Sequence, residues 1–88
     1  VLENDPSVDR YEYEPRFILP DGKWVLPDFK VFAADGSWKI IEVKAAWVFN
    51  LPPEHRKTIK INTYRRLAQC ENVSIEFWTE KDVLHDHL

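Results

Sequence analysis

The sequence predicts a small single domain of the α/β (α+β) class, with a mixed central sheet of about four strands in the order β-β-β-α-β-α. Three observations indicate this class. Two Asp-Gly turns divide the first half into three segments of alternating apolar residues, a basic amphipathic segment follows a Pro-Pro break, and a further alternating segment comes next. Because a chain of 88 residues can bury only one core, residues 1–88 are expected to form one domain.

The first half is expected to form three strands. Arg10–Leu19 alternates aromatic and polar residues, as half-buried strands do. The turn Pro20–Gly22 then leads Lys23–Ala33 back along it as a hairpin. Asp35–Gly36 repeats this chemistry before a third strand, Ser37–Ala46, so the three strands should form an antiparallel meander.

A helix is expected from Pro53 to Cys70, because proline is favoured in the first turn of a helix, where its missing N–H costs nothing. Asn72 ends it. An amphipathic helix of this kind lies with its apolar stripe against a sheet. The residues of that stripe are Ile61, Tyr64 and Ala68.

The last strand is expected at Val73–Thr79, where apolar and polar residues alternate again. A strand that follows a helical crossover usually lies parallel to its neighbour, so the sheet should be mixed. Thr79 suits the N-cap of a short final helix.

The distribution of charge bears on the class of partner. The net charge of −3 argues against a nucleic-acid-binding protein, but residues 54–66 hold five Lys and Arg against one Glu. This local excess has two interpretations, a phosphate-binding surface or the ordinary solvated face of a helix.

Cys70 is the only cysteine, so no internal disulfide can form, and we expect a buried thiol in a reducing compartment. No apolar run approaches the roughly 20 residues that span a bilayer, and no signal peptide is evident near Val1. These observations predict a cytoplasmic protein with no membrane partner.

Charged residues interrupt two of the apolar strands. Pro27-Asp28 lies within WVLPDFKVF, and Glu42-Val43-Lys44 lies within WKIIEVKAAW. Burying an unpaired charge costs several kcal/mol, so these side chains should be paired, solvated in a cleft or bound to a metal ion. Ordinary ion pairing at the surface is the non-catalytic alternative.

Whether the three charges meet depends on strand register. Glu42 and Lys44 are two residues apart and share a face. A strict two-residue turn at Asp35–Gly36 would place Asp28 opposite Val43, on the wrong face. An odd-length loop, or a bulge at Pro27, would bring Asp28 to the same face, and we predict such a distortion because proline cannot donate to the ladder.

Together these residues would suit phosphodiester hydrolysis. Two carboxylates, Asp28 and Glu42, and the main-chain carbonyl of Val43 are the hard oxygen ligands that Mg²⁺ prefers, and Mn²⁺ can substitute for it. Lys44 could then orient a water molecule or stabilise transition-state charge.

The motifs resemble a known group of nucleases. P-D, thirteen residues, then E-x-K resembles the bipartite motif of the PD-(D/E)XK nuclease superfamily, which implies a restriction-endonuclease-like core. Residues 11–14 (YEYE), 26–29 (LPDF) and 42–47 (EVKAAW) resemble phage Holliday-junction resolvases of the endonuclease I type. The chain is similar also to TnsA-like transposon end-cleaving endonucleases, through its Y-E-x-E-P opening, and the resemblance covers residues 10–83.

This resemblance implies a Mg²⁺-dependent DNA endonuclease of DNA recombination, acting in a bacterial or phage-infected cell on branched DNA or on a transposon end. It also implies a homodimer or a partner subunit. Relatives carry a further acidic ligand on an upstream helix, of which this chain holds only a part, with Glu3 as the possible extra acid. Ala45 stands where relatives often have Gly.

Other residues have both functional and structural interpretations. All four tryptophans are expected in or beside the core, and Trp47 has the alternative of stacking on an unpaired base. His85–His87 is more typical of a solvated chain end than of a metal site. The rival functions are a non-catalytic nucleic-acid-binding module and a nuclease acting on RNA or on single strands. The expected phosphate contacts are Arg56, Lys57, Lys60, Arg65 and Arg66.

Overall fold

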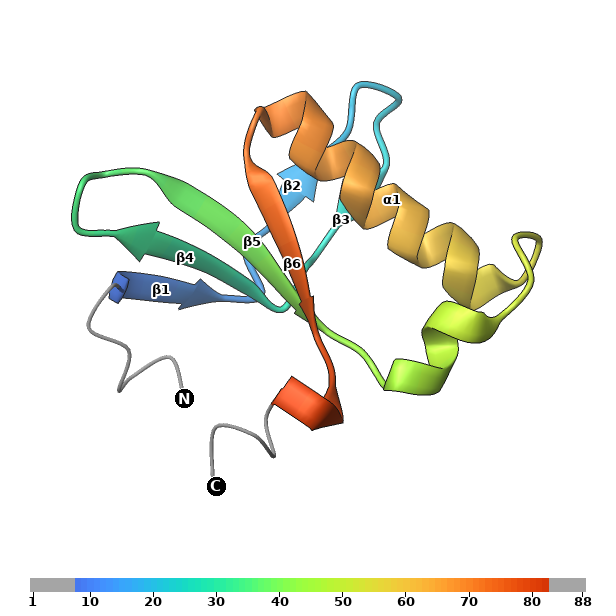
Figure 1. Cartoon of the computed structure of the whole chain (residues 1–88). Helices are drawn as coiled ribbons and strands as arrows, with labels where there is room; N and C mark the ends of the chain where they lie inside the picture. Colours follow the sequence, from blue (N-terminus) through green and yellow to red (C-terminus); the bar gives the residue numbers. More distant parts are fainter. Residues whose placement is uncertain (1–7, 83–88) are drawn as a thin grey trace.

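The computed structural model describes residues 8–82, which form a mixed four-stranded sheet with a long helix, α1, on one face (Figure 1). The strand order is β1-β4-β5-β6, in which β5 and β6 are parallel and the other pairs antiparallel. The bounds are β1 Val8–Tyr13, β4 Phe29–Ala33, β5 Trp38–Val43 and β6 Ser74–Trp78. The predicted α+β class and mixed sheet are confirmed.

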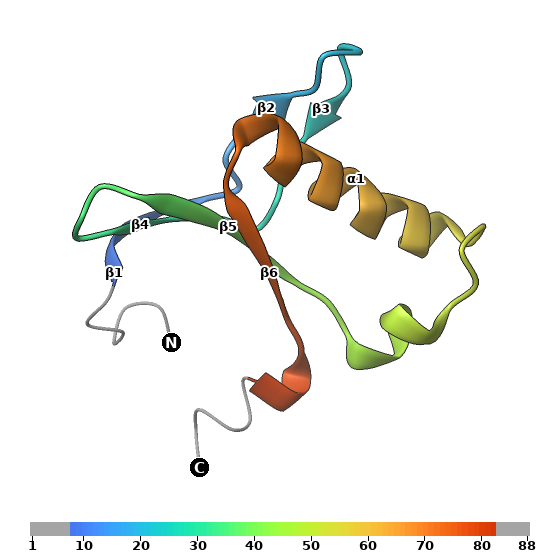
Figure 2. The same cartoon turned by 45° about the horizontal axis from the view of Figure 1, so that its top comes forward.

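The first two expected strands are each broken in two, so the prediction of unbroken strands over Arg10–Leu19 and Lys23–Ala33 is wrong. A separate two-stranded sheet, β2 (Phe17–Ile18) and β3 (Trp24–Val25), continues the hairpin away from the main sheet (Figure 2). Pro15 and Pro27 lie in the two breaks, and neither can donate to a ladder.

The backbone turns sharply at the first of these breaks. Glu14, directly before Pro15, has a φ of 49°, a left-handed conformation that a non-glycine residue adopts at a cost. The ladder is also interrupted at Pro27, because β4 begins only at Phe29. The register is the same on both sides of this interruption, so the bulge predicted at Pro27 is wrong. The two breaks allow β2 and β3 to turn toward the helix.

The turn between β4 and β5 is a three-residue loop, Ala34–Gly36. The main-chain N–H of Ala33 donates to the carbonyl of Ser37 at 2.8 Å, which closes the loop. Gly36 has a φ of 89°, a conformation open to glycine without steric cost. The odd loop length sets the register that pairs Phe29 with Ile41, so the odd-length alternative holds.

The third strand ends earlier than expected. β5 stops at Val43 rather than Ala46, and a short 3₁₀ helix, η2 (Ala46–Asn50), follows it. The main-chain N–H of Ala46 donates to the carboxylate of Glu80 at 3.0 Å, which ties the start of η2 to the segment after β6.

The long helix α1 spans Arg56–Glu71, three residues later at its start than predicted. His55 is its N-cap, and its Nδ1 accepts the N–H of Lys57 at 3.1 Å. Asn72 ends the helix in the left-handed conformation, as expected. A further helical turn begins at Glu80, where the hydroxyl of Thr79 accepts the N–H of Lys81 as predicted for an N-cap.

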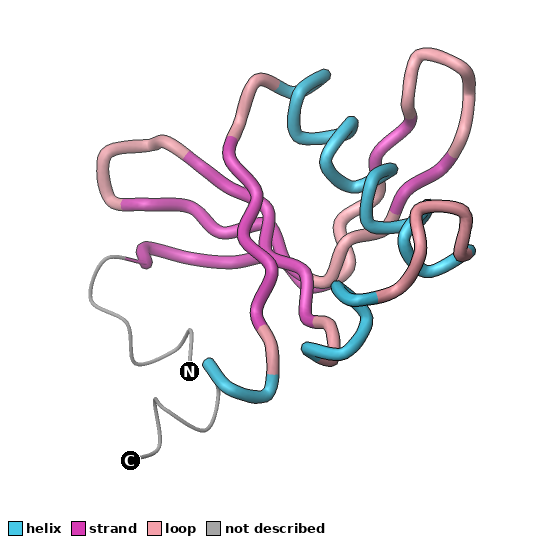
Figure 3. The backbone as a smooth tube through the Cα atoms, turned by 45° about the vertical axis from the view of Figure 1, so that its right-hand side comes forward, coloured by secondary structure: helices cyan, strands magenta, loops and turns pink. Residues whose placement is uncertain are grey.

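The main core lies between α1 and the two sheets, since α1 packs on β6 and on β3 (Figure 3). Burial of the predicted stripe is confirmed, and Leu67 joins it because it lies three residues after Tyr64. A smaller cluster on the opposite face of the sheet is formed by Val31 and Ile41. The buried residues of the main core are Leu19, Val25, Ile40, Tyr64, Leu67 and Ala68.

Three other predictions concern single residues or the membrane. Cys70 is exposed, so the prediction of a buried thiol is wrong. Cys70 lies two residues beyond the buried Ala68 and therefore on another face of the helix. Trp24 and Trp47 are exposed rather than in the core. Glu3 and His85–His87 lie outside the described residues. Between residues 8 and 82, no helix has the length and apolar character needed to cross a membrane.

Candidate active site

The structure brings the three charged residues of the two strands together where β5 ends. Phe29 pairs with Ile41, so the register places Asp28, one residue earlier, beside Glu42. Lys44 shares the face of Glu42, and its Nζ lies 3.8 Å from Glu42 Oε2.

Asp28 is held by three hydrogen bonds that involve the main chain. Its own N–H donates to Glu42 Oε1 at 3.0 Å, and its Oδ2 accepts the N–H of Val43 at 2.7 Å. Its carbonyl accepts the N–H of Glu14 at 2.8 Å. The two carboxylates therefore each bind the backbone of the opposite strand, and their relative position is fixed.

Glu42 is the one charged residue buried among those described, with an exposed fraction of 2%. The pKa of Glu42 is raised to about 7, first by burial and second by hydrogen-bond contact with the Asp28 carboxyl, whereas Tyr64 and Lys44 oppose the rise. Two carboxyls in contact cannot both be ionised without cost, so near neutral pH the pair favours binding either a proton or a cation.

Tyr64 is a further residue of the site, which the sequence analysis assigned only to the core stripe. It reaches from α1 to the sheet, and its buried hydroxyl makes a hydrogen bond with the Glu42 carboxyl. Burial and this acid raise the pKa of Tyr64 well above its ordinary value, so the hydroxyl stays protonated and donates. A hydroxyl on an apolar stripe facing a strand with an embedded acid was the available signal.

Lys44 lies beside this tyrosine. Its Nζ is 5.5 Å from the centre of the Tyr64 ring, within the range of a cation–π contact, and its side chain is 24% exposed. The main-chain N–H of Lys44 donates to the carbonyl of Trp78, which joins the end of β5 to β6. The ammonium is thus held near Glu42 and remains accessible to solvent.

The oxygen atoms at this point suit a hard divalent cation. The N–H of Val43 points to Asp28, and in an extended strand the carbonyl of a residue points to the same side as its N–H. Residues 8–82 hold no group of three or more Asp, Glu, His or Cys side chains placed for a metal. Two carboxylates and one carbonyl nevertheless fit Mg²⁺, which keeps several of its waters.

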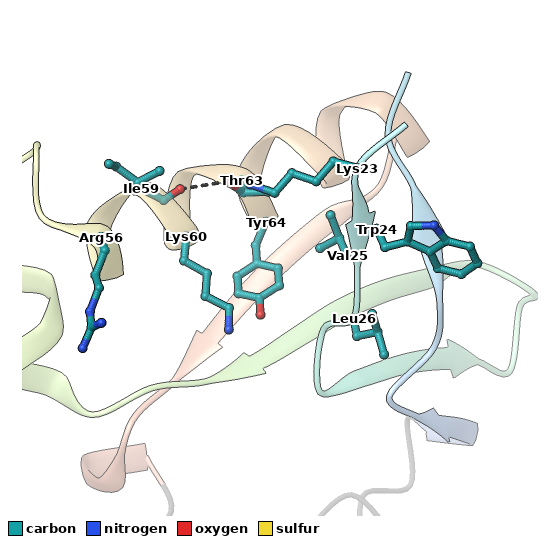
Figure 4. A pocket seen from close by; sticks show the side chains of 9 residues that line it. All are labelled: Lys23, Trp24, Val25, Leu26, Arg56, Ile59, Lys60, Thr63 and Tyr64. Carbon is teal, nitrogen blue, oxygen red and sulfur yellow. Dashed lines mark hydrogen bonds between the residues drawn. The ribbon is translucent and has the colours of Figure 1, made fainter. Parts of the chain in front are cut away.

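The basic residues of α1 divide into two groups. Arg56 and Lys60 point from the helix into a pocket that Tyr64 also lines (Figure 4), and Lys57 Nζ lies 5.8 Å from the Trp47 ring. The second group lies further along α1 and contacts other side chains. Arg66 pairs with Asp21 at 2.7 Å, and Arg65 lies over the Phe77 ring at 5.4 Å.

Comparison of the sequence with protein-family models and with curated protein sequences finds no match to either. What the site can do chemically therefore follows from the geometry of Asp28, Glu42, Lys44 and Tyr64.

Proposed function

We propose that this protein is a Mg²⁺-dependent DNA endonuclease with Asp28, Glu42 and Lys44 at its active centre. The contact between the carboxyls of Asp28 and Glu42 carries the proposal, because an ionised, buried Glu42 beside a second, half-buried carboxylate is costly unless the pair binds a cation or a proton. Structural clusters of this cost are often functional sites.

The roles of the residues follow from their positions. Asp28, Glu42 and the Val43 carbonyl would hold the ion, with Mn²⁺ able to replace Mg²⁺. When bound, such an ion polarises a phosphoryl oxygen and lowers the pKa of a water ligand. Lys44 binds and orients the attacking water or stabilises negative charge on the phosphate, and Tyr64 fixes the carboxylate of Glu42.

The architecture supports a restriction-endonuclease-like core. The P-D motif directly precedes β4, and the E-x-K motif begins within β5 and ends one residue after it. These two strands are antiparallel neighbours, and the strand after α1 lies parallel to β5. The substrate, by the resemblance of the motifs, is branched DNA of the Holliday-junction kind or a transposon end. A second copy or a partner subunit would provide the surface that selects it.

A non-catalytic nucleic-acid-binding module is the second candidate. One observation favours it: the Glu42 carboxyl is already hydrogen-bonded to Tyr64 and to the N–H of Asp28. A protonated Glu42 would then complete a purely structural network.

Cleavage separates the two candidates. Supercoiled plasmid and a four-way junction are incubated with the protein in Mg²⁺, in Mn²⁺ and in EDTA. The proposal expects cleavage only with a divalent ion, at least a hundredfold slower in Lys44→Ala, and unchanged in Lys39→Gln, on the opposite face of the sheet. Junction binding without cleavage in either ion would support the module and refute the nuclease.

A further inference from the structure

We infer that the site takes an unpaired DNA strand, whose phosphates lie in the groove between β3 and α1 and one of whose bases stacks on Trp47. The inference rests on the proposed function for the position of the cut. The binding it describes does not require cleavage, so the two can fail separately.

The groove has two walls and leads to the acid pair. Its volume is about 360 Å³, and it lies between residues 23–26, which include β3, and one side of α1. In Figure 4, Lys60 and Tyr64 project from the helix toward the strands, while the ring of Trp24 points away. Tyr64 lines the groove, and its hydroxyl is hydrogen-bonded to the Glu42 carboxyl. One end of the groove therefore lies at the candidate active site.

The charge of the groove indicates an anionic occupant. Its lining includes three cationic side chains, those of Lys23, Arg56 and Lys60. No acidic side chain from residues 8–82 lines it. None of these three cations has an ion-pair partner within residues 8–82. By contrast, Arg66 is paired with Asp21, and Lys39 with Glu76. Three cations without acids along one groove are what successive phosphates would neutralise.

Trp47, which lies beside the first turn of α1 near Lys57, supplies a surface for a base. It is 56% exposed and lies three residues after Lys44, in η2, which the buried Val48 anchors. Lys57 Nζ is 5.8 Å from the ring, so a positive charge accompanies the aromatic face. A large exposed aromatic ring beside cations is the combination by which proteins bind single strands.

The dimensions favour a single strand over a duplex. A groove of about 360 Å³ is at the lower end of the range for small-ligand sites, so one strand can enter it and a double helix cannot. In a duplex, moreover, both faces of each internal base are already stacked on neighbours. Only an unpaired or displaced nucleotide could place its base on Trp47.

The test measures DNA binding in EDTA, which removes the divalent ion and so prevents the proposed cleavage. Fluorescence anisotropy of an end-labelled oligodeoxythymidylate is compared with that of a blunt duplex of equal length, over a range of salt concentrations. We expect the single strand to bind more tightly. Lys23→Gln should reduce the slope of log K against log salt by about 0.7, the value for one phosphate contact with a single strand.

Variants of Trp47 test the stacking. Trp47→Ala should weaken single-strand binding by about tenfold, and Trp47→Phe should restore most of the affinity. Tyr13→Ala is the matched control, because Tyr13 is also an exposed aromatic residue, at 67%, but lies on the opposite face of the sheet. It should bind as the wild type does.

Duplex binding as tight as single-strand binding would overturn the inference, as would unchanged affinity in Trp47→Ala together with an unchanged salt slope in Lys23→Gln. Absence of cleavage in Mg²⁺ with single-strand binding intact would refute the proposed nuclease instead and leave this inference standing.

Discussion

The carboxylate of Glu42 accepts a hydrogen bond from the main-chain N–H of Asp28, on the adjacent strand, at 3.0 Å. In return, Asp28 Oδ2 accepts the N–H of Val43, next to Glu42, at 2.7 Å. Each acid therefore fixes the strand that carries the other. This reciprocal arrangement places two carboxyls in contact at a buried position, and most of the behaviour expected of the protein follows from that contact.

The stability of the metal-free protein should fall between about pH 4.5 and pH 7. The pKa of Glu42 is raised from 4.5 to about 7 in the folded state. Between these two pH values the folded protein therefore keeps a proton that the unfolded chain has already released. Its favourable contribution is full below the unfolded pKa and is lost as the pH rises through 7. The free energy of unfolding, from urea titrations in EDTA, should fall by up to about 3 kcal/mol over this range.

Glu42→Gln should remove that dependence, because the amide mimics the protonated acid at every pH. The variant should be more stable than the wild type at about pH 8 in EDTA and inactive in cleavage. Glu12→Gln, exposed on β1, serves as the control and should keep the wild-type profile. If the wild type and Glu42→Gln show the same pH profile, Glu42 does not hold the proton.

Tyr64→Phe tests a positioning residue rather than a catalytic one. The hydroxyl of Tyr64 lowers the pKa of Glu42 by its hydrogen bond, so its removal should shift the midpoint of the pH–rate profile upward. Losing a hydrogen bond to a charged buried group should also destabilise the protein at about pH 8 by roughly 1.5–3 kcal/mol. A variant that loses stability with an unshifted pH–rate midpoint would assign Tyr64 to packing alone.

Gly36 should be the residue on which the register depends. Its φ of 89° disfavours residues with a Cβ, especially β-branched ones, so Gly36→Val should cost at least about 1 kcal/mol in unfolding free energy. Gly36→Asn, which tolerates positive φ better, should cost less. Equal losses in the two variants, measured by urea unfolding, would mean that the loop does not require this conformation.

Much of the architecture could be predicted from the residues, because turn chemistry and alternation are local. The Asp-Gly pairs predicted both turns, and the prolines after Leu51 predicted a helix start to within three residues. The site depended on one further fact, the number of residues in the second loop. The sequence allowed either a two-residue or an odd-length loop. The three-residue loop in the structure places Asp28 beside Glu42.

Other features required tertiary information. The break at Pro15 was missed, although the register places it directly opposite Pro27, so that the two residues without N–H groups fall at one point of the hairpin. The pairing of Arg66 with Asp21, 45 residues away, could not be read from a basic helix alone. The sequence places Tyr64 on the apolar stripe of the helix. Its contact with Glu42 depends on how α1 packs on the sheet, which the sequence alone does not show.

The binding of one Mn²⁺ ion is the most direct test of the central claim that Asp28 and Glu42 form a cation site. Titration of Mn²⁺ followed by electron paramagnetic resonance should show one site per chain in the wild type at about pH 8. The site should be lost in Asp28→Asn and in Glu42→Gln and kept in Lys44→Ala. Equal Mn²⁺ binding by the wild type and Asp28→Asn, or none by the wild type, would show that Asp28 and Glu42 do not form a cation site.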